Sequence, residues 1–229
     1  MNKNYAEFTA EMKDTHTILI PNMLPIHFKL VKRILENYGY KVELLETEGA
    51  HIAETGLKYV HNDTCYPAIL VIGQMMDALL SGKYDVNKTA LMLFQTGGGC
   101  RASNYVSLMR KALVNAGMPQ VPVVPLSFSG IEKHLGFDFS LGMIYRMAYG
   151  LLYGDLMMAI ANQVRPYEIN KGDADAVCDK WTEILVREMA DSGIKYGKVK
   201  KNYKAIIADF AKIPREDRRA VQVGIVGEI

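Results

Sequence analysis

The chain has 229 residues, of which 49% are hydrophobic and 23% are charged, and its formal net charge is +2. This composition is that of a globular protein with one large or two small domains, and the charge is too small to indicate binding to nucleic acid or to an anionic membrane. We see no signal peptide and no apolar stretch long enough to span a membrane. With only three cysteines, we expect no disulfide framework, and a cytoplasmic protein with reduced thiols.

Four short runs have the pattern of buried parallel strands, because each is apolar on both faces and rich in β-branched residues. They are residues 16–20, 41–45, 89–94 and 121–126. Pro122 and Pro125 favour a place near an edge of the sheet for the last run.

Helical patterns separate these runs at residues 25–38, 67–80 and 101–116. The second pattern is apolar on almost every side, so we expect a deeply buried helix there. The alternation predicts the α/β class, with a three-layer, doubly wound parallel sheet of about four strands in the order 2-1-3-4. Residues 46–64 form a long connection for such a fold, which indicates a functional or disordered loop.

After residue 127 the pattern becomes helical, with helices predicted at 137–164, 173–189 and 203–211. The last residues, 221–229, have the pattern of a buried strand, so we expect a truncated piece of a longer polypeptide, and the exposed strand edge favours a homodimer. The predicted organisation is an N-terminal extension at 1–13, a parallel α/β domain at 14–127, a helical subdomain at 128–220 and the start of a strand of a following domain at 221–229.

Cys65 and Cys100 each precede a predicted helix and follow a strand in the chain. In a doubly wound sheet the strand-to-helix turns share the carboxyl edge, so we expect the two thiols to lie side by side. A helix N-terminus stabilises a thiolate, and thiolates are the ligands that iron–sulfur clusters use. The alternative is that both cysteines are small core residues, which is also the role we expect for Cys178.

Gly97, Gly98 and Gly99 directly precede Cys100. This turn resembles a phosphate cradle but lacks the dinucleotide GxGxxG and the Walker lysine. The alternative is a tight turn at which the backbone must approach another group closely. Such a turn would also suit an iron–sulfur cluster with its sulfide ligands. No spacing of the histidines indicates a metal site, and no motif identifies a nucleophile or a general acid, so the catalytic residues stay unknown.

Several motifs are similar to those of one family. They are ILIP followed by PIHF in residues 18–28, NDTCYP with GQ in 62–74, QTGGGCRASNY in 95–105, YGD with RPYE in 153–168, and VGIVGEI in 223–229. Together they resemble the C-terminal region of the large CoA-substrate-specific enzyme activases, which are related to the 2-hydroxyacyl-CoA dehydratases and the double-cubane cluster proteins.

The resemblance implies an iron–sulfur domain, of the [4Fe–4S] kind, for low-potential electron transfer in anaerobic metabolism. Its partners would be the remaining domains of the polypeptide, a redox partner or an acyl-CoA substrate. Only Cys65 and Cys100 match cysteine-bearing motifs of the family, and the activase ATP-binding motifs are not recognisable here. Two alternatives remain: a non-catalytic structural or docking module of a larger activase polypeptide, and a flavodoxin-like binder of a nucleotide or flavin.

Overall fold

The computed structural model describes residues 5–95, 101–126, 136–192, 194–219, 221, 223 and 224. These residues form two compact units. The first contains the described chain up to Met23 together with Gly39–Phe139, and the second contains Leu24–Tyr38 and the described chain from Ser140 onward.

The first unit is built on an all-parallel sheet of four strands in the order β2-β1-β3-β4. The strands are β1 (Thr17–Pro21), β2 (Lys41–Leu45), β3 (Thr89–Phe94) and β4 (Val123–Leu126). Ile18 of β1 is in register with Val42 on one side and with Ala90 on the other, so β1 is an interior strand. The sheet is flanked by helices, so the predicted three-layer α/β class is confirmed, and so is the predicted strand order.

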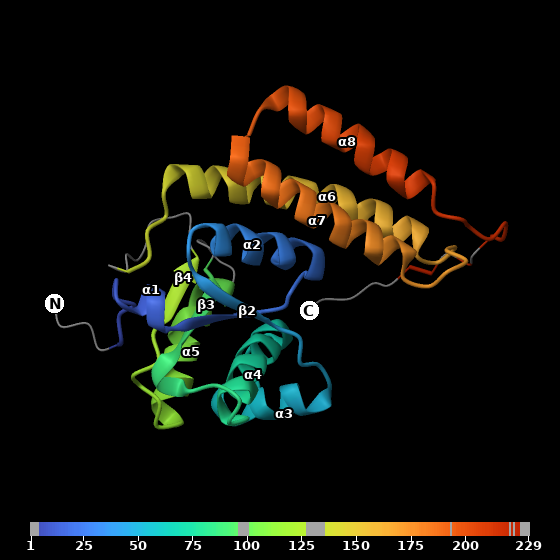
Figure 1. Ribbon diagram of the computed structural model, residues 1–229. Helices are drawn as coiled ribbons and strands as arrows, with labels where there is room; N and C mark the ends of the chain where they lie inside the picture. The colour runs from blue at the N-terminus through green and yellow to red at the C-terminus, as the bar shows by residue number, and fades with distance from the viewer. Residues whose placement is uncertain are drawn as a thin grey trace. The chain divides into compact units, whose positions relative to one another are not determined.

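Helices α3, α4 and α5 pack with one another beside this sheet, as Figure 1 shows. The helical elements of the unit are α1 (Met12–Thr15), α3 (Ala50–Tyr59), α4 (Tyr66–Leu80), η1 (Val86–Lys88), η2 (Arg101–Asn104) and α5 (Tyr105–Asn115). The prediction of a loop at 46–64 was wrong, because α3 lies inside it. Only Ile52 and Gly56 of α3 are buried.

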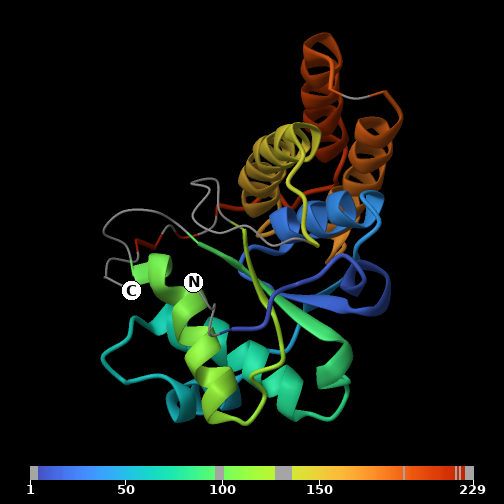
Figure 2. The same ribbon diagram turned by 90° about the vertical axis from the view of Figure 1, so that its left-hand side faces the viewer.

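Helix α4 is the centre of the core of this unit. Nine of its residues are buried, namely Ala68, Ile69, Val71, Ile72, Gly73, Met75, Met76, Ala78 and Leu79. Its contact with α3 is unusually close, because a Cβ atom at Gly73 would overlap the carbonyl oxygen of Ile52. A Cβ atom at Gly56 would in the same way overlap the carbonyl oxygen of Ile69, so the two helix backbones meet at the two glycines. The neighbouring turns of the two helices are visible in Figure 2.

The second unit consists of four helices. They are α2 (Pro25–Asn37), α6 (Leu141–Val164), α7 (Asp173–Ser192) and α8 (Tyr196–Ala211). Helix α2 lies between two strands in the sequence but packs on α6 and α7 in this unit. The predicted third helix of the helical region, at 203–211, begins two turns earlier, at Tyr196. Within the described ranges, no helix combines the length and the apolar character needed to cross a membrane.

The predicted strand at 221–229 is not formed at residues 221, 223 and 224, which are the residues of this segment that the structure describes. Val221 and Val223 have no strand pairing and are 88% and 78% exposed. Residues 222 and 225–229 lie outside the described residues, so pairing of this segment with a second copy stays a prediction.

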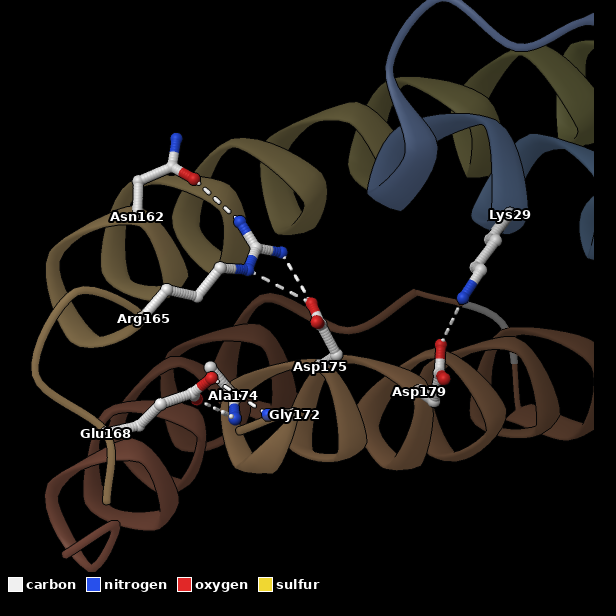
Figure 3. Close-up of polar contacts among 8 residues, drawn as sticks. All are labelled: Lys29, Asn162, Arg165, Glu168, Gly172, Ala174, Asp175 and Asp179. Atoms are coloured by element: carbon white, nitrogen blue, oxygen red, sulfur yellow. Dashed lines mark hydrogen bonds and ion pairs between the residues drawn. The ribbon is translucent and has the colours of Figure 1, made fainter. Parts of the chain in front are cut away.

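Glu168 joins the connection after α6 to the start of α7. Its buried carboxylate accepts hydrogen bonds from the backbone N–H groups of Gly172 (2.8 Å) and Ala174 (2.9 Å), as drawn in Figure 3. Arg165 adds a second link, since its guanidinium donates to the Asp175 carboxylate at 2.6 Å. The two bonds of Glu168 satisfy N–H groups that the start of a helix leaves without partners.

Two further polar contacts hold α2 in the unit. Lys29 donates to Asp179 of α7 at 2.6 Å, also drawn in Figure 3. The Nε2 atom of the buried His27 lies 2.9 Å from a carboxylate oxygen of Asp155 in α6. Gly154 makes this possible, because a Cβ atom there would meet the His27 ring, at 2.5 Å from its nearest carbon.

The burial of α4 predicts a contrast between two of its apolar residues. Met75 is fully buried, whereas Leu70 is only half-buried. Met75→Ala should lower the free energy of unfolding by about 2–5 kcal/mol, because it leaves a cavity in the core. Leu70→Ala should cost clearly less, and urea titration of both variants checks the difference. Equal losses would mean that the burial of α4 is misassigned.

The cap at α7 predicts a dependence of stability on pH. The two backbone N–H groups lower the pKa of Glu168, so its carboxylate stabilises the fold fully above the unfolded pKa of about 4.3 and loses this effect as the pH falls through the lowered folded pKa. Glu168→Gln should therefore reduce the melting temperature at pH 7, and the difference from the unmodified chain should shrink in acid. Glu54→Gln is the control, because Glu54 is exposed on α3 and should matter little. A difference that is constant with pH would contradict this role.

Candidate functional site at the carboxyl edge of the sheet

The carboxyl ends of the parallel strands mark the candidate site in the first unit. Strands β1, β2 and β3 end at Pro21, Leu45 and Phe94. Because all strands run in the same direction, the segments that follow them start from one edge of the sheet, where ligands bind in open α/β sheets.

Cys65 lies at this edge as the residue that caps the N-terminus of α4. Its carbonyl oxygen accepts hydrogen bonds from Ala68 (3.0 Å) and Ile69 (3.3 Å), while its side chain caps no N–H group. The half-buried thiol lies 3.7 Å from the hydroxyl oxygen of Tyr105, the first residue of α5. The start of α4 and the start of α5 therefore meet. In contrast to the prediction from the sequence, Cys65 does not follow a strand directly, because α3 lies between β2 and α4.

Cys100 and the turn Gly97, Gly98 and Gly99 lie outside the described residues, so the predicted proximity of the two thiols stays a prediction. The flanks of this segment are described. The side-chain amide of Gln95 donates to the carbonyl oxygen of Ser103 at 3.0 Å, which closes the end of β3 onto the turn η2. Helix α5 begins at Tyr105 rather than at Arg101, because η2 forms the first turn.

Cys178 has the structural role that the sequence predicts. It lies on α7 in the second unit and is 5% exposed. Burial raises the pKa of its thiol to about 11, which keeps it protonated at neutral pH. A protonated, buried thiol neither ligates a metal nor reacts readily.

Gln74 organises the loops that leave β1 and β2. Its side-chain oxygen accepts a hydrogen bond from the backbone N–H of Asn22 at 3.1 Å. Its side-chain nitrogen donates to the carbonyl oxygens of Leu45 (3.3 Å) and Thr47 (2.7 Å). One amide on α4 thus fixes two loops at the carboxyl edge, a role that the sequence pattern did not reveal.

A cavity of about 490 Å³ lies between these loops and the first half of α4. Met23, Ile52, Tyr66 and Leu70 give it apolar walls, and α3 closes one side. Sequence reasoning missed this cavity because it missed α3.

Metal-ligand clusters are not apparent in the described part of the chain, where no three side chains of His, Cys, Asp or Glu are grouped to hold a metal ion. His61 lies near Cys65 in the sequence, but its ring contacts Asp63 on the exposed surface at 3.3 Å. Cys65 is therefore the one described thiol at this edge.

The three hydrogen bonds of Gln74 predict a cost for removing its amide. Gln74→Met keeps the length of the side chain but leaves the Asn22 N–H and two carbonyl groups without their partner. We expect a loss of about 1–3 kcal/mol in the free energy of unfolding. Gln120→Met is the matched control, since Gln120 makes one exposed contact with Asn87. Similar small losses in both variants, measured by urea titration, would show that Gln74 does not organise the edge.

Comparison with known proteins gives this chain no relative. No family model, no curated protein and no solved structure matches it. The resemblance to the activase family therefore depends only on motifs such as those in residues 62–74, 95–105 and 153–168.

Proposed function

We propose that this chain is the cluster-binding part of a 2-hydroxyacyl-CoA dehydratase- or activase-type protein and that Cys65 and Cys100 ligate an iron–sulfur cluster at the carboxyl edge of the sheet. The contact between the Cys65 thiol and the Tyr105 hydroxyl, at 3.7 Å, carries this proposal. Tyr105 follows Cys100 by five positions, and Arg101, the next residue after Cys100, already belongs to η2.

The surroundings of Cys65 suit a ligand thiolate. Its side chain is half-buried and caps no N–H group of α4. The N-terminal dipole of a 15-residue helix favours negative charge at this position. The Tyr105 hydroxyl can donate a hydrogen bond to a thiolate, and hydrogen bonds to ligand sulfurs tune the potential of a cluster.

The described residues and Cys100 supply two thiolates, fewer than the four cysteines that iron–sulfur clusters usually take. Other ligands would have to come from outside these residues, which agrees with the expectation that further domains of the polypeptide complete the site. A bound cluster would supply one-electron transfer at low potential. The sulfurs of this chain would hold it, and Gly97, Gly98 and Gly99 would let the backbone approach it. A redox partner, an acyl-CoA substrate and a cytoplasmic location belong to the same proposal.

A second candidate is a flavodoxin-like binder of a flavin or nucleotide. The strand order β2-β1-β3-β4 favours it, because flavodoxin-type sheets share this order and bind their cofactor at the carboxyl edge. A non-catalytic docking module is the remaining alternative, in which Cys65 simply packs against the core of α4 and α5.

Anaerobic purification, followed by reconstitution with iron and sulfide, separates these functions. We expect a yellow-brown chain with stoichiometric iron and sulfide. Cys65→Ser and Cys100→Ser should each lower the bound iron several-fold, because each removes a ligand. Cys178→Ser is the matched control and should leave it unchanged, since Cys178 is buried in the other unit.

Three results would count against a cluster. A colourless chain after reconstitution would favour the docking module, and flavin absorbance would favour the second candidate. Equal iron content in all three cysteine variants would show that Cys65 and Cys100 are packing residues and not cluster ligands.

A further inference from the structure

The cavity at the carboxyl edge has the size of a small-molecule site. Its volume of about 490 Å³ lies within the roughly 300–1,000 Å³ that such sites occupy. Cys65 is not among the described residues that line it, and these residues come from the segments that follow β1 and β2 and from α3 and α4. Its occupant is therefore a separate question from the iron–sulfur cluster.

Most of the cavity wall is apolar. Met23 and Tyr66 remain 44% and 56% exposed beside it. Leu70 is half-buried, although its neighbours on α4 are almost all fully buried. Covering this surface with the apolar body of a ligand would remove it from water, which is favourable in proportion to the area covered.

One polar residue of the wall, Asn22, has a side-chain oxygen that accepts no hydrogen bond from the described residues. This oxygen is also closed to water, although Asn22 is one of the residues that line the cavity. Gln74 cannot supply one, because its amide nitrogen already donates to Leu45 and Thr47. A ligand that draws the Asn22 amide into the cavity would add a hydrogen bond to its oxygen and break none.

The charge of the wall excludes one class of ligand. Glu48 stands at the rim, and the described residues that line the cavity include no lysine, arginine or histidine. A phosphate or carboxylate would lose its water and meet a like charge. An amine or a hydroxyl group would meet the Glu48 carboxylate, and also the Asn22 amide oxygen once that side chain turns into the cavity.

We propose that this cavity binds a neutral or cationic small molecule with an apolar body and an amine or hydroxyl donor. The donor bonds to Asn22 and Glu48, and the body lies against Met23, Tyr66 and Leu70. The cavity is not a site for the phosphates of a nucleotide. This assignment does not depend on the iron–sulfur proposal, since the described residues that line the cavity do not include Cys65.

Three probes with the same ring and different charge test the proposal: benzylamine, benzyl alcohol and benzoate. The readout is the ε-methyl NMR signal of Met23 in chain labelled with ¹³C-methyl methionine, and Met23→Leu assigns that signal. Benzylamine and benzyl alcohol should shift it in a saturable way, with benzylamine up to roughly fivefold tighter because Glu48 is exposed. Benzoate should not shift it at the same concentrations.

Two variants locate the binding. Glu48→Gln, on the surface, should remove the preference for benzylamine over benzyl alcohol and leave benzyl alcohol binding unchanged. Leu70→Trp should fill the cavity and abolish all shifts. Leu57→Trp is its control, because Leu57 is 49% exposed on α3 and does not line the cavity.

Opposite results would overturn the proposal. These are no saturable shift with any probe, binding of benzoate as tight as that of benzylamine, or an undiminished preference for benzylamine in Glu48→Gln. Binding that survives Leu70→Trp would place the probes elsewhere. The probe experiment does not depend on iron content, so failure of the cluster proposal would leave this result standing. Failure of the cavity proposal would likewise leave the cluster proposal standing.

Discussion

The structure of the first unit depends on one helix that has almost no polar face. Helix α4 buries nine of its fifteen residues, and no single neighbour can cover so much apolar surface. The sheet, α3 and α5 all contact it. Since burial of apolar side chains is the main favourable term in folding, these neighbours are held where they can cover α4.

The backbone approach at Gly56 and Gly73 is the closest part of this packing. It brings the carbonyl oxygens of Ile52 and Ile69 against the two glycines, so a larger residue at either glycine would push α3 away. Gln74, the next residue of α4, can then reach the loops after β1 and β2. The same helix begins at Cys65. A cysteine at the sheet edge and a cavity beside it are therefore two consequences of where α4 lies.

The motifs that resemble the activase family fall into two structural classes. Residues of the YGD and RPYE motifs serve packing in the second unit: Gly154 makes room for His27, Asp155 binds the same ring, and Glu168 caps α7. The motifs around Cys65 and Gln74 instead lie at the carboxyl edge of the first unit. This division supports looking for chemistry at the sheet edge and for stability in the helical unit.

The sequence by itself determined the α/β class, the four strands, their order and the burial of α4. These features follow from local patterns, because parallel strands covered by helices are continuous apolar runs and a buried helix is apolar on all sides. It also placed Cys178 correctly among the packed residues, since Cys178 lies in an amphipathic repeat.

Only the tertiary structure decided the rest. Helix α3 buries just Ile52 and Gly56, and its close backbone contact with α4 joins residues that are far apart in the chain. The grouping of α2 with α6 and α7 and the three hydrogen bonds of Gln74 also join residues that are far apart in the chain. Such contacts leave no periodic signal, because periodicity records the direction in which a residue faces and not the partner it meets there.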